Sequence, residues 1–284
     1  MHNHHFLSPR SFFFARKRLN WLMKTQSHEV APHTWQGMPA TSPDMVSHEL
    51  MNVAISIDLD GQEGLDHWRK DTQPNLPWAD DHFEERVCGA PINPGREWQN
   101  WPWGKNAANF LDEQGMFNHN YMERYWPKEA GNIIRPTQDA EDYWAVTRGP
   151  SQLPSWSMRY GIRNEYGDLH DLVASLAGDP ETRQAWFPVF HPEDVGYVVG
   201  GRKPCSLGYQ FIRREDKLNV YYPLRSCDLV RHWADDCYLT IRLLLWVLEG
   251  CKTINPDAWR YVTVGNFMMH CTSLHVFAND MRSL

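Results

Sequence analysis

The second half of the chain carries its clearest alternation of hydrophobic and polar positions. Four apolar residues, Leu169, Leu172, Val173 and Leu176, recur at positions i, i+3, i+4 and i+7, which is the spacing of one helix face. Gly178 follows where this spacing stops, and glycine commonly comes directly after a helix. The pattern therefore predicts an amphipathic helix over about 169–177.

Two segments of alternating residues follow, and a charged stretch joins them. Apolar residues occupy every second position over 207–211 and again over 218–224, which predicts two β-strands. If the turn between them is centred near Glu215, antiparallel pairing places position 205 opposite position 225. Cys205 and Arg225 are therefore expected to be neighbours.

The remaining elements of the second half predict the fold class. A long apolar helix is expected over about 235–249, closed by Gly250, and a last strand over about 261–277. Helices that alternate with strands, together with one hairpin, favour an α/β or α+β fold around a mixed sheet. A single catalytic domain over 41–284 is expected.

The middle of the chain has a different composition. Tryptophan, proline, asparagine and glycine are dense over 74–160, which is typical of irregular packed loops, and an insertion is expected around 90–155. One short helix is predicted at about 78–88. Within it Glu85 lies four residues after Asp81, so the two carboxylates share a face.

The N-terminal residues 1–40 combine histidine, arginine, lysine and phenylalanine. Their apolar run at 12–15 is too short for the hydrophobic core of a signal peptide. We therefore expect a basic, disordered extension at this end.

Composition narrows the classes of function. The 284 residues are 42% hydrophobic and carry a formal charge of −7, which allows a large core but gives no overall attraction to nucleic acid or an anionic membrane. No segment has the ~20 apolar residues of a transmembrane helix. A cytoplasmic protein that holds one nucleotide phosphate with a few arginines is expected, rather than one that binds a nucleic acid polymer.

The cysteines supply the candidate chemistry. Six of them are scattered without the spacing of a disulfide framework or a zinc site, so we expect reduced thiols and no metal. A thiol becomes a nucleophile when its thiolate is stabilised, and an adjacent guanidinium favours the charged form. Pairing with Arg225 makes Cys205 a candidate nucleophile. The alternative is that Cys205 is a small buried apolar residue.

Motifs in this half of the chain resemble the thymidylate synthase family. The segments PC at 204–205, QF at 210–211 and RSCD at 225–228 are similar, in order and interval, to the family pattern around its nucleophilic cysteine. DPETR at 179–183 and LHVF at 274–277 are similar to two further family segments. The resemblance covers roughly two fifths of the chain and does not extend before residue 160.

The resemblance implies a fold, a reaction and a cofactor. The fold is a large mixed sheet flanked by helices, with one sheet face as the interface of a homodimer. The reaction transfers a one-carbon unit from 5,10-methylenetetrahydrofolate to a pyrimidine nucleoside monophosphate. Cys205 would attack carbon 6 of the ring, Asp228 would face the folate pterin, and Glu85 or Glu84 would be the general base on the folate side.

The resemblance also implies roles in substrate binding. Arg225 and Ser226 would hold the 5′-phosphate, and Arg183 would reach the phosphate bound by the partner subunit. Gln210 would order the nucleotide, and His275 would contact the sugar. For Arg183 and His275 taken alone, a surface ion pair and a core histidine are the simpler alternatives.

Two positions depart from the synthase pattern. Ser206 replaces the histidine after the nucleophile. Asp236, or Asp235 if the alignment carries a one-residue gap, replaces the asparagine that reads uracil. A carboxylate accepts from the amino group of cytosine and from its protonated ring nitrogen, whereas the uracil carbonyl would face it without a donor. The alternative is that these aspartates cap the following helix.

The aspartate changes the expected substrate from dUMP to dCMP. The product would be 5-hydroxymethyl-dCMP, because water and not hydride completes the reaction. Three alternatives stay open: a CMP hydroxymethylase of nucleoside antibiotic biosynthesis, a synthase or hydroxymethylase that acts on dUMP, and a nucleotide-binding dimer without catalysis. If a phage encodes the protein, its location is the host cytoplasm.

Overall fold

The structure is a computed structural model of the chain. It describes residues 4–35, 38–61, 64–104, 111, 115–117, 120–129, 132–135, 145–148, 166–195 and 203–284. The chain divides into two compact units: unit 1 contains Met1–Pro74, Val173–Trp186 and Cys205–Leu284, and unit 2 contains Asn75–Leu172 and Phe187–Pro204. The expected single domain over 41–284 stays a prediction.

A seven-stranded mixed sheet contains six strands of unit 1 and β8, which begins in unit 1 at Trp186 and continues into unit 2. The strand order is β1-β5-β11-β10-β9-β8, and β2 also pairs with β5. The strands are β1 (His5–Leu7), β2 (His28–Val30), β5 (Ser47–Asp58), β8 (Trp186–Pro188), β9 (Gly208–Arg214), β10 (Lys217–Asp228) and β11 (Thr263–Phe277). β1 is parallel to β5 and β10 to β11, whereas β11 is antiparallel to β5 and β9 to β10. The predicted mixed α/β architecture is confirmed.

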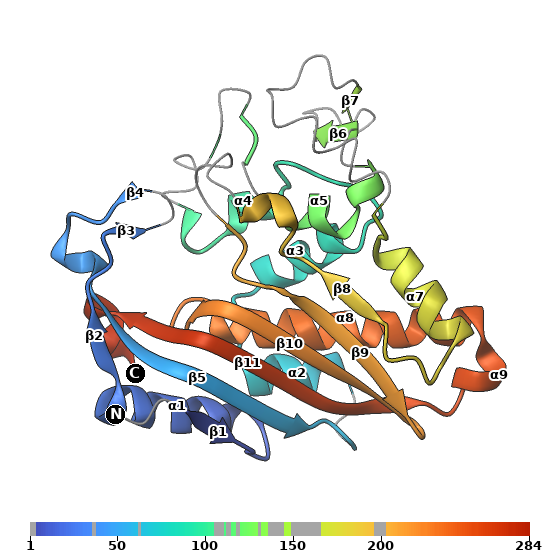
Figure 1. The fold of residues 1–284 in the computed structure, drawn as a ribbon, viewed down its shortest axis with the longest axis horizontal. Coiled ribbons are helices and arrows are strands. Elements are labelled where there is room, and N and C mark those ends of the chain that lie inside the picture. The colour runs from blue at the N-terminus through green and yellow to red at the C-terminus, as the bar shows by residue number, and fades with distance from the viewer. Residues whose placement is uncertain are drawn as a thin grey trace. The chain divides into compact units, whose positions relative to one another are not determined.

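Helices pack on one face of this sheet. The helices of unit 1 are α1 (Phe12–Gln26), α2 (Leu65–Thr72), α8 (Trp233–Ile254) and α9 (Pro256–Trp259), with 3-10 turns η1 (Pro43–Met45) and η8 (Ala278–Ser283). In Figure 1, α2 and α8 lie behind β10 and β11. Phe12 of α1 ties the layers together, because its ring lies 6.2 Å from Trp68 of α2, 6.3 Å from Trp233 of α8 and 5.0 Å from Phe267 of β11.

Residues 4–35 are ordered, so the expectation of a disordered extension is wrong for them. β1 and β2 both pair with β5, and α1 buries Phe12, Ala15, Leu19, Leu22 and Met23. Those five positions are spaced as one helix face, and their burial outweighs the basic residues between them, of which Lys17 and Arg18 are exposed. A short antiparallel pair, β3 (Thr34–Trp35) and β4 (Met38–Pro39), follows.

The β9–β10 hairpin has a two-residue turn. Glu215 adopts a left-handed backbone conformation with φ of 55°, and Arg214 pairs with Lys217 across the turn. The centre therefore falls half a residue beyond the one predicted. Continued without change, this register would place Cys205 opposite Ser226.

Helix α8 continues past Gly250, so the predicted end at that residue is wrong. A side chain at Gly250 would lie 2.8 Å from Cγ1 of Val173, which belongs to α7 (Leu169–Gly178). Tertiary packing explains this glycine, because its lack of a side chain lets Val173 approach the α8 backbone. The helix predicted at 169–177 is confirmed.

Unit 2 contains shorter elements. They are α3 (Trp78–Arg86), α4 (Glu97–Asn100), α5 (Tyr121–Tyr125), the 3-10 turns η3 (Pro127–Glu129) and η7 (Pro192–Asp194), and the antiparallel pair β6 (Asn132–Arg135) and β7 (Ala145–Arg148). Buried Arg124 donates two hydrogen bonds to the Asp194 carboxylate, at 2.6 and 2.7 Å, and a third to the Val189 carbonyl at 2.8 Å. This paired charge joins α5 to η7.

The predicted helix at 78–88 is confirmed as α3. Much of the insertion predicted around 90–155 lies outside the described residues. Within the part of the chain that is described, no helix is both long and apolar enough to cross a membrane.

The close approach at Gly250 predicts an unusual effect of alanine. Glycine to alanine inside a helix normally stabilises it, but at Gly250 the new methyl group would overlap Val173, whose branched side chain has little freedom to move. We expect Gly250→Ala to lower the free energy of unfolding by about 1–3 kcal/mol in urea titration.

Two controls accompany this measurement. Gly178→Ala adds a methyl group with no atom within 4 Å, so it should leave stability unchanged or higher. Val173→Ala in the Gly250→Ala background should restore part of the loss. Equal stability of Gly250→Ala and Gly178→Ala would contradict the packing argument.

Candidate active site

A change of register within the hairpin brings Cys205 beside Arg225. Beyond the start of β9, Ser206 bridges to Leu224, and the Arg225 N–H donates to the Cys205 carbonyl at 3.0 Å. Both pairings are one residue out of step with the register near the turn. The predicted neighbourhood of Cys205 and Arg225 is therefore confirmed, although an irregularity in the ladder produces it.

Two donors are directed at the Cys205 thiol. Arg225 Nη2 lies 3.8 Å from Sγ and Ser226 Oγ lies 3.6 Å from it. Arg225 Nη1 also donates to Ser226 Oγ at 3.1 Å, so the three side chains form one cluster. Cationic and hydroxyl donors both favour a thiolate over a thiol.

The other five cysteines lack such surroundings. Cys227, Cys237, Cys251 and Cys271 are buried, and burial raises the pKa of each thiol, to about 12 for Cys251. Cys88 is exposed, and desolvation again raises its pKa. Of the six, Cys205 has the environment of a nucleophile.

The two aspartates at the start of α8 face different partners. Asp235 is buried beside Arg16 of α1, whose guanidinium also lies 5.5 Å from the Trp233 ring. Asp236 Oδ1 accepts from the Tyr222 hydroxyl at 3.3 Å, and Oδ2 accepts from the Cys227 thiol at 3.4 Å. The N-cap of α8 is His232, and both aspartates lie in the first turn of the helix.

Tyr222 connects Asp236 to the cysteine loop. Its hydroxyl lies 2.6 Å from Ser206 Oγ, and Ser206 directly follows Cys205. The structure therefore places Asp236, and not Asp235, in the network that reaches Cys205.

Asp228 and His275 are direct neighbours on β10 and β11. Burial raises the pKa of Asp228 and lowers the pKa of His275. Asp228 Oδ1 accepts the N–H groups of Val230 and Arg231, both at 3.0 Å, whereas buried Oδ2 lies 3.7 Å from Arg231 Nε and accepts no hydrogen bond among the described residues. A ligand N–H would satisfy that oxygen.

Titratable residues continue from Asp228 and His275 onto the neighbouring strands of the sheet. His275 pairs with Glu49 of β5, and Glu49 pairs with His28 of β2. His28 Nε2 lies 3.2 Å from Glu49 Oε2, and Ser273 Oγ donates to the same carboxylate. Sequence reasoning missed Glu49 because only strand pairing places it next to His275.

Gln210 and Arg183 lie together on the other side of β9. Gln210 Nε2 donates to the Arg183 carbonyl at 3.1 Å, and the adjacent Phe211 N–H donates to the Ala185 carbonyl at 2.9 Å. These bonds lead away from β10, where Arg225 lies. The structure thus brings Gln210 and Arg183 to each other, not to the thiol.

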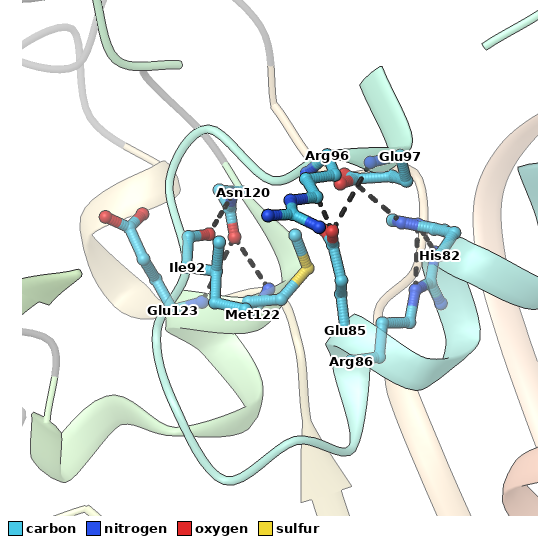
Figure 2. A network of polar contacts seen from close by, with 9 residues as sticks. All are labelled: His82, Glu85, Arg86, Ile92, Arg96, Glu97, Asn120, Met122 and Glu123. Carbon is cyan, nitrogen blue, oxygen red and sulfur yellow. Dashed lines mark hydrogen bonds and ion pairs between the residues drawn. The ribbon is translucent and has the colours of Figure 1, made fainter. Parts of the chain in front are cut away.

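Glu85 lies in unit 2, in a carboxyl pair that the sequence did not reveal. Figure 2 shows its side chain directed at the backbone N–H groups of Arg96 and Glu97, which donate to Oε1 at 2.7 and 3.3 Å. A side chain at Gly95 would lie 1.8 Å from Glu85 Oε2 and 2.0 Å from Glu97 Oε2. The two carboxyl groups therefore occupy the space that a side chain at Gly95 would fill. Glu84 is exposed.

Glu97 is 1% exposed, and both burial and the neighbouring Glu85 raise its pKa well above the usual range. The raised pKa places the proton of the pair on Glu97. On its other side, Glu97 Oε1 lies 3.4 Å from Nδ1 of His82, whose Nε2 accepts from Arg86 Nε at 2.9 Å (Figure 2). The acceptor Nε2 faces Arg86, and Nδ1 of the same ring faces Glu97.

Comparison with known proteins agrees with these motifs. No protein-family model matches the chain. It is 27% identical over 186 residues to a deoxyuridylate hydroxymethyltransferase of Bacillus phage SP01, covering 63% of this chain and 38% of that protein. It is 26% identical over 171 residues to a thymidylate synthase of Rhodopseudomonas palustris strain BisA53, covering 55% of this chain and 54% of that protein.

These similarities support a relationship to the thymidylate synthase family. The chain spans about two fifths and about half of the lengths of these two relatives. The large mixed sheet of unit 1 agrees with a thymidylate synthase-like fold.

The buried carboxyl pair predicts that stability falls as pH rises. Above about pH 4.3, the ordinary glutamate pKa, the folded chain keeps a proton on Glu97 that the unfolded chain releases, so the free energy of unfolding decreases until pH passes the raised pKa. Glu97→Gln keeps a donor beside Glu85 and removes this loss. We expect its Tm to exceed that of the parent chain at pH 8 and to match it at pH 4.

Glu84→Gln is the matched control, because Glu84 is an exposed residue of the same helix. It should shift Tm by a similar small amount at both pH values. A Glu97→Gln variant whose Tm follows the parent at every pH would show that the pair does not share a proton.

Proposed function

We propose that the chain is a member of the thymidylate synthase family and a hydroxymethyltransferase that acts on the pyrimidine nucleotide dCMP. The observation that carries the proposal is the convergence of Arg225 and Ser226 on the Cys205 thiol. Both relatives have names that denote one-carbon chemistry on pyrimidine nucleotides or their products, which supports the reaction class.

Cys205 is the nucleophile of the proposed reaction. Its Sγ adds to carbon 6 of the pyrimidine, and the electron pair of the 5,6 double bond moves to carbon 5. Carbon 5 then takes up the one-carbon unit, loses its proton to a base and releases tetrahydrofolate as the leaving group, which leaves an exocyclic methylene on the ring. When water has added to that unit, the thiolate leaves and the double bond is restored. Arg225 stabilises the Cys205 thiolate before it adds to the ring and again when it leaves. With Ser226, Arg225 also binds the phosphate.

Asp236 is the proposed reader of the base. Its carboxylate is half-buried and held by Tyr222 and Cys227, one donor on each oxygen. A carboxylate oxygen can accept more than one hydrogen bond, which suits the amino group and the protonated ring nitrogen of cytosine. Asp235 is committed to Arg16, so it is the weaker candidate.

The residues present fit a folate. 5,10-Methylenetetrahydrofolate supplies a one-carbon unit at the oxidation level of formaldehyde. Asp228 Oδ2 is buried without a hydrogen-bond partner among the described residues, so it can accept an N–H of the pterin. His275 is proposed to contact the sugar, and Gln210 to order the nucleotide.

Glu85 is the proposed general base. One oxygen is held by two backbone N–H groups, and the other lies beside protonated Glu97. A carboxylate with such a neighbour can take up a proton and pass it on.

A second candidate function is the same reaction on dUMP. The printed name of the phage relative specifies deoxyuridylate, which favours it. The carboxylate of Asp236 argues for cytosine, because it would face a carbonyl of uracil with no donor between the two groups.

A homodimer is also proposed, with Arg183 reaching the phosphate in the partner subunit. The sheet face opposite α2 and α8 presents Ala54, Ser56, Tyr221, Met268 and His270, and Phe6 of β1 adds to this surface with 73% exposure. Apolar and aromatic side chains of this kind are typical of an interface.

We expect the chain to convert dCMP, methylenetetrahydrofolate and water to 5-hydroxymethyl-dCMP and tetrahydrofolate, measured by mass spectrometry. Cys205→Ala should lower the rate at least about a thousandfold, because it removes the proposed nucleophile that adds to carbon 6. Dihydrofolate should not form, since no hydride is consumed. Absence of product from dCMP, CMP and dUMP alike would contradict the proposal.

The two aspartates form a matched pair of variants. Asp236→Asn should lower kcat/KM for dCMP about a hundredfold and raise relative activity on dUMP, because an amide complements uracil. Asp235→Asn should change stability more than base preference. The reverse result would identify Asp235 as the reader.

The proposed interface predicts the effect of a charge on the sheet face. Met268→Glu places a carboxylate among apolar neighbours and should shift the sedimentation coefficient from that of a dimer to that of a monomer. Tyr261→Glu, at a residue with 77% exposure outside this face, is the control and should leave the dimer intact. A monomeric parent chain would rule out this interface.

A further inference from the structure

A buried chain of polar groups runs from Ser206 through Tyr222 to Asp236. The Tyr222 hydroxyl lies 2.6 Å from Ser206 Oγ and 3.3 Å from Asp236 Oδ1. The three residues come from the loop before β9, from β10 and from α8. The chain therefore joins the residue next to the proposed nucleophile to the proposed reader of the base.

Packing alone does not require a tyrosine at this position. The Tyr222 ring is 1% exposed and stacks on Tyr209 with a centroid distance of 4.7 Å and an angle of 9° between the planes. Phenylalanine would make the same stack and avoid the cost of burying a hydroxyl, about 1–3 kcal/mol when it lacks partners. The hydroxyl is retained where it contacts two groups of the site.

The direction of these hydrogen bonds follows from the number of protons. A tyrosine hydroxyl has one proton, and an ionised carboxylate can only accept. Tyr222 therefore donates to Asp236, and Ser206 donates to Tyr222. Each hydrogen bond polarises the next, so the bond from Ser206 strengthens the hydrogen bond that Asp236 accepts from Tyr222.

The second oxygen of Asp236 is held as well. Cys227 Sγ donates to Oδ2 at 3.4 Å, so the carboxylate has one donor on each oxygen. Two donors fix the plane of the carboxylate, which rotates freely about its χ2 angle when it is unsupported. A fixed plane decides which pattern of base donors the remaining lone pairs can accept.

We propose that Tyr222 is the positioning residue that fixes the Asp236 carboxylate and thereby sets the preference between cytosine and uracil. This inference rests on the proposed function, because it takes Asp236 as the reader of the base. Ser206 acts through Tyr222, in the position where a synthase has histidine. Ser206 and Asp236, the two positions that differ from the synthase pattern, then act together in recognising the base.

The test is the affinity of Tyr222→Phe for dCMP and dUMP, measured by calorimetry with the full chain. We expect the ratio of the two Kd values to fall at least about tenfold, the usual effect of losing a hydrogen bond to a charged group. Affinity for deoxyribose 5-phosphate, which has no base, should stay within about twofold of the parent chain. Loss of fold would lower both affinities and is thereby recognised.

Tyr209→Phe is the matched control, because Tyr209 is the stacking partner of Tyr222 and is equally buried. It should keep the parent ratio. An unchanged ratio in Tyr222→Phe, or an equal fall in both variants, overturns the role of Tyr222 while the proposed function stands. A parent chain that binds both nucleotides equally also overturns it. Binding of neither nucleotide and no product would overturn the proposed function itself.

Discussion

The hydrogen bond from the Arg225 N–H to the Cys205 carbonyl is the constraint on which the candidate site depends. The regular ladder of the hairpin would pair Cys205 with Ser226, and the shift of one residue replaces that neighbour with Arg225. One residue changes which face of a strand a side chain occupies. The shift therefore allows both Arg225 and Ser226 to reach the same sulfur atom.

The helices behind the sheet determine which of the two aspartates faces Tyr222. Adjacent helix residues are separated by about 100°, so Asp235 and Asp236 cannot face the same partner. Phe12 packs among Trp68, Trp233 and Phe267 and so holds α1 in place. In this position Arg16 interacts electrostatically with Asp235. Asp236 is then directed at Tyr222. The core thus determines which carboxylate faces the thiol loop, although neither the core nor α1 contains a proposed catalytic group.

In unit 2 a different constraint applies. Glu85 and Glu97 share the volume next to Gly95, and burial there makes two negative charges unfavourable. A protonated Glu97 resolves the conflict beside Glu85, whose Oε1 accepts two backbone N–H groups. If Glu85 is the general base, Glu97 is the group that adjusts it. Only the folded loop between α3 and α4 makes them neighbours.

Sequence alone determined what depends on local spacing and residue type. It predicted α3, α7, the hairpin, β11 and the mixed sheet, because helices and strands impose their own periodicity. It also predicted that Cys205 and Arg225 are neighbours. Tertiary structure decided the rest. Contacts between distant segments order residues 4–35 and let α8 continue through Gly250. They also give the two aspartates different partners. Periodicity along the chain carries no information on such contacts, because long-range packing creates them.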